Sequence, residues 1–321
     1  MLFFWKYDYS NCSSCKFAEI LFLETNNHTI LFPSSQIDLS IKREDLIHPL
    51  ISGNKFRKLK YNLAECKKQR LQKMLTFGGA FSNHIAAVAA LGQEYEIETI
   101  GIIRGEELSK NWHQNPTLQF AADCGMQLDF ISREEYTHKN TEIFIKKLIE
   151  IHGDFYLLPE GGTNGLAIKG CEEILTGQDA AFDYICCAVG TGGTISGIIN
   201  SIKPHQKVLG FPALKGDFLK EEIRKFAHND NWTLIEGYDF GGYAKINTEL
   251  IDFINRFYKE TTIPLDPVYT GKMVFGVIDL IRKGYFPKDS KILMIHTGGI
   301  QGIRGMNLRL KNIKLPLIDY P

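Results

Sequence analysis

Apolar, β-branched segments alternate with helical patterns along most of this chain, and this alternation limits its fold more than any other feature. Between most of the apolar segments lie stretches such as "SNHIAAVAALG" and "NTEIFIKKLIEIHG", whose apolar residues recur at helical spacing. Strands that alternate with helices indicate βαβ units and parallel sheets. Seven strands over 321 residues predict two open α/β domains rather than one. The predicted strands are 73–79, 97–103, 127–131, 155–162, 184–190, 207–213 and 291–299.

Charge and hydropathy exclude several classes of protein. Lys+Arg and Asp+Glu both total 37, so the net charge is zero and we expect no binding to nucleic acid or to a membrane surface. No apolar run approaches the length of about 18 residues that a transmembrane helix needs. The N-terminal stretch "MLFFWKYDYSNCSSC" is broken by Lys6 and Asp8, so we do not interpret it as a signal peptide.

The seven cysteines favour a reducing compartment, and we expect a cytoplasmic protein. Cys12 and Cys15 form a CxxC, but no second CxxC or HxxxH accompanies it, so we predict a polar turn and no metal site. Cys186 and Cys187 lie in the apolar run "DYICCAVG", where we expect them to pack as small hydrophobic residues.

The stretch "VGTGGTISGI", after the predicted strand 184–190, is the strongest sign of a binding site. Its backbone N–H groups and its threonine hydroxyls can surround a tetrahedral anion. The stretch is no P-loop, because no Gly-Lys-Ser/Thr follows, and Ile195 occupies the position of the last glycine in the dinucleotide fingerprint. An ordinary strand–turn–helix link is the alternative, but we favour phosphate binding.

A second glycine-ended strand leads into "TFGGAFSNHIAAVAALG". Ser82 or Asn83 is expected to cap the helix that follows, and Gly92 to end it. With His84, these two residues form a polar cluster at a helix start that could face a ligand. An ordinary α/β turn explains the pattern equally well.

The stretch "SGNKFRKLKYNL" predicts a helix that begins at Asn54 as its N-cap. Its first two turns contain Lys55, Arg57, Lys58 and Lys60, with no acid before Glu65, although helix N-termini favour negative side chains. Either these cations lie in solvent or an anion binds nearby.

Together with weaker motifs, these stretches resemble the fold-type II pyridoxal-phosphate enzymes. Within that group the chain is similar to the branch of 1-aminocyclopropane-1-carboxylate (ACC) deaminase and D-cysteine desulfhydrase. The resemblance runs from about Leu39 over nearly the whole chain and implies a tryptophan synthase β-subunit-like fold. The motifs that carry it, in the family's order, are "IKREDL", "SGNKFRKL", "GGAFSNH", "LPEGGTN", "VGTGGT", "GGYAK", "DPVYTGK" and "IHTGG".

The resemblance implies pyridoxal 5′-phosphate (PLP) as cofactor. Lys55 matches the lysine that forms the Schiff base with the cofactor aldehyde, and neighbouring cations at a helix N-terminus would lower its pKa. Lys58 matches a lysine near the cofactor phosphate, which would be held mainly by Thr191, Gly192, Gly193 and Thr194. For Arg57 and Lys60 a solvated helix face remains the expectation.

Further matches assign roles to polar and aromatic residues. Asn83 matches the residue that hydrogen-bonds the cofactor's ring hydroxyl. Ser82 matches a residue beside the substrate carboxylate, and His84 lies in the same turn, so Ser82, Asn83 and His84 would bind the substrate. Tyr243 and Tyr269 match two active-site tyrosines that gate protons or hold substrate; the alternative is buried aromatic rings with satisfied hydroxyl groups.

The implied reaction removes the α-proton of a small amino acid, with freed Lys55 as base, and ends in a 2-oxo acid and ammonia. Thr270 matches the position that faces the cofactor's ring nitrogen, where ACC deaminase is expected to have a glutamate. We therefore favour D-cysteine desulfhydrase-like β-elimination with release of sulfide. ACC deamination is the alternative within the family. Two hypotheses from other functional classes are a non-catalytic PLP-binding protein and a nucleotide-dependent enzyme.

The resemblance also implies the organisation of the chain. We expect a large PLP-binding domain at 1–56 and 162–321, with a smaller α/β domain inserted at 57–161. A homodimer is expected from the resemblance alone.

Overall fold

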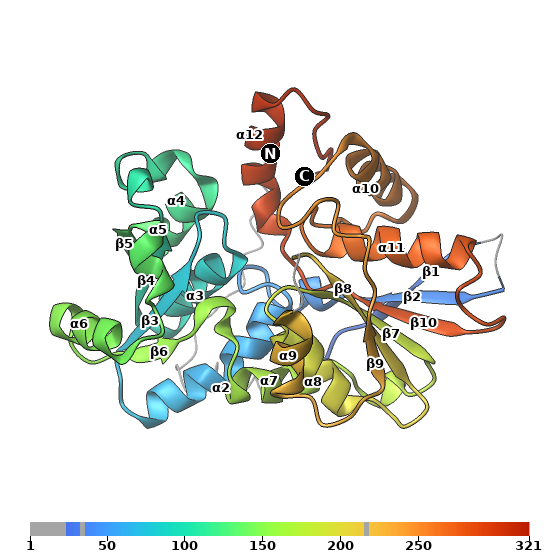
Figure 1. The fold of residues 1–321 in the computed structure, drawn as a ribbon, viewed down its shortest axis with the longest axis horizontal. Helices are drawn as coiled ribbons and strands as arrows, with labels where there is room; N and C mark the ends of the chain where they lie inside the picture. The colour runs from blue at the N-terminus through green and yellow to red at the C-terminus, as the bar shows by residue number, and fades with distance from the viewer. Residues whose placement is uncertain (1–23, 33–35, 215–217, 321) are drawn as a thin grey trace, which may run out of the picture.

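The structure, a computed structural model, describes residues 24–32, 36–214 and 218–320, and these form two separate sheets. The CxxC motif of Cys12 and Cys15 lies outside the described residues. Figure 1 shows the two sheets beside each other, each covered by helices.

The larger sheet has six strands in the order β1-β2-β10-β7-β8-β9. The edge strand β1 runs antiparallel to β2, and the other pairs are parallel. The strands of this sheet are β1 (Asn27–Ile30), β2 (Asp38–Lys42), β7 (Tyr184–Val189), β8 (Lys207–Pro212), β9 (Trp232–Leu234) and β10 (Lys291–Ile295).

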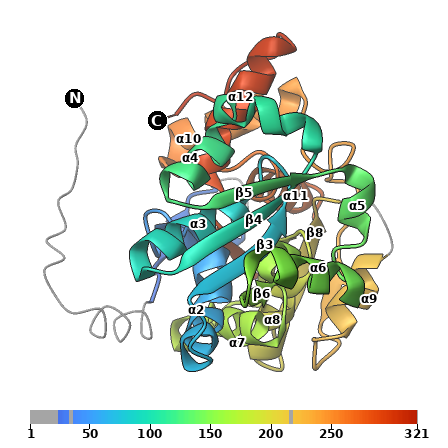
Figure 2. The same ribbon diagram turned by 90° about the vertical axis from the view of Figure 1, so that its left-hand side faces the viewer.

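The smaller sheet has four parallel strands in the order β5-β4-β3-β6. Figure 2 shows these strands in that order from the side of the smaller sheet. They are β3 (Lys73–Gly78), β4 (Glu98–Arg104), β5 (Gln127–Ile131) and β6 (Tyr156–Leu158).

Helices bury both faces of each sheet, which explains why the strands are almost continuously apolar. On the larger sheet, α10, α11 and α12 pack on one face and α7, α8 and α9 on the other. On the smaller sheet, α2, α3 and α4 face α5 and α6 across the strands. The helix bounds are α2 (Asn54–Lys68), α3 (Asn83–Tyr95), α4 (Pro116–Asp123), α5 (Arg133–Thr137), α6 (Glu142–His152), α7 (Gly165–Glu172), α8 (Gly193–Ser201), α9 (Phe218–Arg224), α10 (Thr248–Thr261), α11 (Thr270–Arg282) and α12 (Ile303–Asn312).

The predicted fold class is confirmed: both sheets are mainly parallel, and each of the seven predicted segments contains a strand. Cys186 and Cys187 are fully buried in β7, as expected. The strands β1, β2 and β9 were not predicted.

Two details of the helix ends differ from the prediction. Gly53, not Asn54, is the N-cap of α2, and the Asn54 side chain instead reaches across to α8. Gly92 does not end α3, which continues to Tyr95 and is closed by Glu96 in the left-handed region. A Cβ on Gly92 would lie 2.5 Å from Thr99 Cγ2, so this glycine allows α3 to pack closely against β4.

The domain boundaries at 56/57 and 161/162 remain a prediction. All four strands of the smaller sheet lie between residues 73 and 158, and all six of the larger sheet lie outside that range. The first boundary, however, falls inside α2, so this helix contains residues of both predicted domains.

Candidate active site

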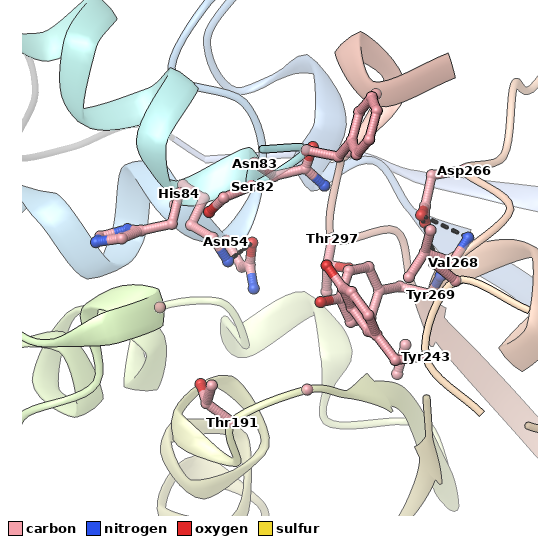
Figure 3. Close-up of a pocket in the computed structure, with 18 of the residues that line it drawn as sticks. Asn54, Ser82, Asn83, His84, Thr191, Tyr243, Asp266, Val268, Tyr269 and Thr297 are labelled. Carbon is pink, nitrogen blue, oxygen red and sulfur yellow. Dashed lines mark hydrogen bonds between the residues drawn. The ribbon is translucent and has the colours of Figure 1, made fainter. Parts of the chain in front are cut away.

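A cavity of about 530 Å³ is lined by residues that belong to both halves of the chain. The N-terminal ends of α2, α3, α8 and α11 all contribute residues to its wall, as does the loop that follows β10. Figure 3 shows side chains from these segments around a common space. Because helix N-termini present unpaired N–H groups and partial positive charge, this arrangement favours an anionic ligand.

Lys55 lies in the first turn of α2 and lines the cavity. Burial, and then the charge of Lys58, lower the pKa of Lys55 from 10.5 to about 7. Its Nζ atom lies 3.3 Å from Asn54 Oδ1, which is a neutral acceptor. Near neutral pH, a large fraction of this amine is therefore unprotonated and able to act as a nucleophile or base.

Lys58 lies one turn further along α2 and is 2% exposed. Its ammonium donates hydrogen bonds to Gly161 O at 2.9 Å and Thr163 Oγ1 at 3.0 Å, which are both neutral. Burial lowers the pKa of Lys58. No carboxylate among the described residues pairs with this lysine to offset the effect of burial. A buried ammonium without an anionic partner fits the phosphate of a cofactor well.

The glycine-rich turn before α8 lies directly beside this ammonium. A Cβ on Gly193 would lie 3.1 Å from Lys58 Nζ and 2.7 Å from Thr163 Oγ1, so only glycine leaves this space open. Thr191 Oγ1 shares a hydrogen bond of 2.8 Å with Thr163 Oγ1. Thr194 Oγ1 accepts one of the same length from Asn54 Nδ2. The donor set and the open space fit a tetrahedral phosphate.

The other two cations of α2 do not lie on a solvated face, which corrects the expectation for Arg57 and Lys60. Both are almost fully buried. Arg57 donates two hydrogen bonds to Glu44, at 2.9 and 3.0 Å, and Lys60 pairs with Glu173. The acids therefore neutralise the far side of α2 and leave Lys55 and Lys58 as the cations of this helix that face the cavity.

The polar cluster at the start of α3 also lines the cavity. Ser82 is the N-cap, and its Oγ accepts a hydrogen bond from the Ile85 N–H group. Asn83 lies against the loop after β10, where a Cβ on Gly299 would be 3.0 Å from Asn83 Nδ2. Gly299 has a φ of +95°, a conformation that glycine adopts without strain.

His84 is buried and held as a neutral imidazole. Burial first, and then the charges of Lys55 and Lys58, lower its pKa well below 6.5. Thr76 Oγ1 donates to Leu158 O and lies 2.8 Å from His84 Nε2, so the network assigns the proton to Nε2. Nδ1 is then an acceptor without a partner in the described part of the chain. In Figure 3 the ring points away from Tyr243 and Tyr269.

Tyr243 and Tyr269 meet at the opposite side of the cavity, as Figure 3 shows. Their ring centroids are 6.2 Å apart in an edge-on arrangement. Burial raises the pKa of Tyr269 well above 10 and also raises that of Tyr243, where interaction with the Tyr269 hydroxyl partly offsets the rise. Tyr243 is 46% exposed, so it lies where the cavity opens to solvent.

Thr270, in contrast, does not line the cavity. It is fully buried in the first turn of α11, and its hydroxyl donates to Asp266 Oδ1 at 2.8 Å while it accepts from the Asp266 N–H group at 2.9 Å. The Asp266 carboxylate, which does line the cavity, also accepts from the backbone N–H groups of Val268, Tyr269 and Thr270. Asp266 therefore caps α11 and has little free acceptor capacity.

Several residues at the site were missed in the sequence. Thr163 joins Lys58 to Thr191, Asn54 joins α2 to α8, and Asp266 organises the segment that carries Tyr269. Thr163 and Asp266 lie inside motifs already quoted, "LPEGGTN" and "DPVYTGK", so their motif membership was the available signal. Arg104, which also lines the cavity, lies in no quoted motif.

Within the described ranges, no group of three or more His, Cys, Asp or Glu side chains could hold a metal ion. No helix in the same ranges is long and apolar enough to cross a membrane.

Comparison with known proteins agrees with this geometry. The family model described as "Pyridoxal-phosphate dependent enzyme" matches residues 24–298. A bifunctional D-cysteine desulfhydrase/1-aminocyclopropane-1-carboxylate deaminase of Arabidopsis thaliana is 32% identical, in an alignment that covers 83% of this chain and 73% of that one. A 1-aminocyclopropane-1-carboxylate deaminase of Bradyrhizobium sp. strain BTAi1 is 26% identical over 86% of this chain and 91% of its own length.

The solved structures give the same result. A crystal structure of an ACC deaminase homologue has a TM-score of 0.76 and 27% identity, and the match covers 92% of this chain and 95% of that chain. The matched family range includes the cationic start of α2, the glycine-rich turn and both tyrosines. This chain therefore belongs to the family of pyridoxal-phosphate dependent enzymes.

Proposed function

We propose that this enzyme catalyses β-elimination from a small amino acid, with D-cysteine as the favoured substrate, to give sulfide, a 2-oxo acid and ammonia. The observation that carries the proposal is the pair of lysines at the start of α2 that line the cavity. One has a pKa of about 7 and the other is an ammonium whose partners are neutral. A nucleophilic amine beside an anion site is the arrangement that an aldehyde cofactor with a phosphate group requires.

The residues assigned to the cofactor divide into three groups. Lys55 would bond to the aldehyde carbon. Lys58, Thr191, Gly192, Gly193 and Thr194 would hold the phosphate, and Asn83 would face the ring hydroxyl. Thr270 does not line the cavity and would lie behind the Asp266 carboxylate, at the end where the resemblance places the ring nitrogen. When bound, PLP supplies an electron sink for the carbanion that forms at the substrate Cα.

The start of α3 provides the site for the substrate carboxylate. Ser82 and Asn83, at the N-terminal end of this helix, line the cavity. Helix N-termini present unpaired N–H groups that favour a carboxylate. His84, held neutral, adds no positive charge there. The neutral Lys55 amine can take the α-proton at its Nζ atom, and a tyrosine hydroxyl on the facing wall can deliver a proton to the leaving group.

The environment of Thr270 supports sulfide elimination over opening of a cyclopropane ring. The residue at this position is a neutral hydroxyl, and the nearby Asp266 carboxylate is already occupied by three N–H groups and one hydroxyl. A ring nitrogen at this end would find no free carboxylate to keep it protonated, so the electron sink would be weak. A good leaving group such as sulfide requires less electron withdrawal than a carbon–carbon bond.

ACC deamination is the second candidate, because a named ACC deaminase matches 86% of this chain and another relative is named for both activities. A non-catalytic PLP-binding protein is the candidate from a different class. It would keep Lys55 and the phosphate site but would turn over no amino acid. By resemblance we also expect a homodimer, and the seven cysteines favour the cytoplasm.

The test begins with the purified protein after reconstitution with PLP. Borohydride reduction followed by peptide mass spectrometry should place the cofactor on Lys55, and the visible absorption should be lost in Lys55→Ala. D-cysteine, L-cysteine, D-serine and ACC are then added separately, with assays for sulfide and 2-oxo acid. Sulfide from D-cysteine alone supports the proposal, and 2-oxobutyrate from ACC would favour the second candidate. Absorption without turnover of any substrate would indicate the non-catalytic protein.

A further inference from the structure

Arg104 is a cation of the cavity wall that has no role in the proposed binding of the cofactor or of the substrate carboxylate. It ends β4, it is exposed, and its side chain lines the cavity. Within the described residues, it makes no ion pair and no hydrogen bond. An arginine that ends a strand beside an active-site cavity without a carboxylate partner is available to a ligand.

The position of the guanidinium group is set by two neighbours. Its carbon lies 5.5 Å from the ring centroid of Tyr136, which is a cation–π contact. Its Nη2 lies 3.6 Å from the position that a Cβ on Gly79 would take, at the turn that leads into α3. Because the N–H groups of Arg104 have no hydrogen-bond partner among the described residues, they can bind an anion in a bidentate manner.

The two acids that line the same cavity are both engaged elsewhere. Asp266 caps α11, as described above. Glu160 lies 3.4 Å from Lys139 Nζ, and no ion pair between Glu160 and Arg104 occurs among the described side chains. The positive charge of Arg104 is therefore not neutralised by its own wall.

The anions already assigned do not account for Arg104 either. The cofactor phosphate is assigned to Lys58 and the turn before α8, and the substrate carboxylate to the first turn of α3. Arg104, Phe81 (51% exposed) and Tyr243 (46% exposed) line the cavity and are also open to solvent, so they lie at its entrance, away from the buried Lys58. A substrate whose Cα lies at Lys55 would extend its β-substituent toward this entrance.

We propose that Arg104 binds the β-substituent of the substrate as an anion, so that the enzyme prefers amino acids whose leaving group carries negative charge. This inference rests on the proposed function. A cysteine thiolate is the smallest member of the class, and S-sulfonates and O-phosphates of the corresponding three-carbon amino acids are larger members.

The elimination balances without any redox partner. The Cα–H bond breaks and its proton goes to Lys55 Nζ, while the electron pair forms the Cα=Cβ bond. The bond from Cβ to the substituent breaks, and the substituent leaves with its electron pair. Thiosulfate and phosphate leave as anions, whereas the cysteine sulfur takes a proton from a tyrosine hydroxyl and leaves as hydrosulfide. The remaining enamine takes up water and gives a 2-oxo acid and ammonia. A guanidinium group stabilises the charge that the substituent carries as it leaves.

The experiment compares the reconstituted wild-type enzyme with Arg104→Gln, Arg104→Lys and the control Arg133→Gln. Arg133 follows the neighbouring strand β5, but it is already paired with Glu107 at 2.5 Å and does not line the cavity. Each protein is assayed with both enantiomers of S-sulfocysteine and O-phosphoserine, which are anionic, and of O-acetylserine and β-chloroalanine, whose substituents are neutral. The dissociation constants of 2-amino-3-phosphonopropionate and alanine, measured by calorimetry, give a readout that does not depend on turnover.

We expect Arg104→Gln to lower kcat/KM for the anionic substrates about 10- to 100-fold, the range for a lost charge-assisted hydrogen bond. The neutral substrates should change less than about threefold, Arg104→Lys should fall between, and Arg133→Gln should match the wild type. The affinity for the phosphonate, but not for alanine, should fall in parallel.

Two results would overturn the inference. Equal losses for anionic and neutral substrates in Arg104→Gln would mean that Arg104 holds the shared carboxylate or supports the fold. No loss for either would mean that the guanidinium group does not meet the substrate. In both cases turnover of β-chloroalanine by the wild type would leave the proposed elimination intact, whereas a wild type that eliminates from none of these substrates would refute the elimination and the inference with it.

Discussion

At the scale of single residues, the site depends on two lysines, Lys55 and Lys58, that have no carboxylate partner among the residues that the structure describes. Both lie on α2 within one turn of each other, and burial lowers the pKa of each. The neighbouring charge of Lys58 lowers the pKa of Lys55 further. The same helix thus holds one amine that is partly neutral near pH 7 and one ammonium placed for an anion.

The first prediction concerns the pH dependence of cofactor uptake. The neutral amine attacks the PLP aldehyde, and its population increases as pH rises through the pKa of Lys55, about 7. The rate of absorption change after mixing with PLP should therefore rise between about pH 6 and pH 8 and then level off. A rate that continues to rise toward pH 10 would show an ordinary lysine. Replacing Lys58 by Met should shift the midpoint to higher pH, because one of the causes of the lowered pKa is removed.

The second prediction separates the two tyrosines. Burial raises both pKa values, but in Tyr243 the interaction with the Tyr269 hydroxyl works against that rise. Tyr243 is thus the easier of the two to ionise and is the better proton donor. Tyr243→Phe should lower kcat at least about tenfold, while Tyr269→Phe should lower it less. Steady-state kinetics with D-cysteine would decide this, and a larger loss in Tyr269→Phe would reverse the assignment.

Local sequence predicted the residues of the cavity wall better than it predicted the environment of each one. Ser82, Asn83, Lys55 and the glycine-rich turn all line the cavity, because their roles follow from helix starts that the chain pattern already indicates. Arg57 and Lys60 looked like a solvated face, because their partners, Glu44 and Glu173, are 13 and 113 residues away in the chain. A charged side chain looks solvent-exposed in the sequence when the residue that pairs with it lies far away in the chain.

At the scale of secondary structure, α2 is held from behind by buried ion pairs. Arg57 and Glu44 are both nearly inaccessible, and Glu44 also accepts a hydrogen bond from Thr25 at 2.5 Å. Lys60 and Tyr61 both pair with Glu173, which follows α7. These contacts join α2 to the 3₁₀ turn Glu44–Leu46 after β2 and to α7, and so fix the helix that carries Lys55.

The third prediction follows from this support. Glu44→Gln should lower the free energy of unfolding by about 3–5 kcal/mol, because it leaves the buried Arg57 guanidinium without its counter-charge. The matched control is Glu107→Gln, which breaks the exposed pair with Arg133 and should cost less than about 1 kcal/mol. Urea unfolding followed by circular dichroism measures both variants. Similar losses in the two would show that the Glu44 pair contributes no more than a surface pair.

The strands that sequence analysis missed have a physical reason in common. β1 and β9 are short edge strands of four and three residues, too short for a periodic pattern. β2, "DLSIK", lies inside the sheet but contains a fully buried Lys42, which pairs with Asp179 at 2.7 Å. Because Asp179 is 137 residues away, the local sequence does not show that this lysine is paired and buried in a strand.

At the scale of the whole molecule, the cavity exists because segments from both halves of the chain meet at one place. Lys58 comes from α2, Thr163 follows β6 of the smaller sheet, and Gly193 begins α8 beside the larger sheet. The hydroxyl of Thr163 contacts both Lys58 and Thr191, so it links the smaller sheet's last strand to the glycine-rich turn. The alternation of strands and helices predicted the two sheets, but no local pattern could indicate this meeting of three distant segments.

The last prediction tests that meeting point. In Gly193→Ala, the new methyl group would lie 2.7 Å from Thr163 Oγ1 and 3.1 Å from Lys58 Nζ. The ammonium and the hydroxyl would therefore have to move away from the positions in which they can bind the phosphate. The affinity for PLP should fall at least about tenfold, which corresponds to roughly 1.4 kcal/mol. Gly165→Ala is the control, because a Cβ there meets nothing within 4 Å.

Titration of each variant with PLP, monitored by absorption, and a thermal melt without cofactor separate binding from folding. Gly193→Ala should lose affinity while its melting temperature falls only by the few degrees expected for a local clash. Wild-type affinity in Gly193→Ala would mean that the phosphate does not lie between α2 and α8, and the assignment of Lys58 would then be wrong as well. The variant therefore tests, in a single residue, whether the two sheets are brought together to hold one anion.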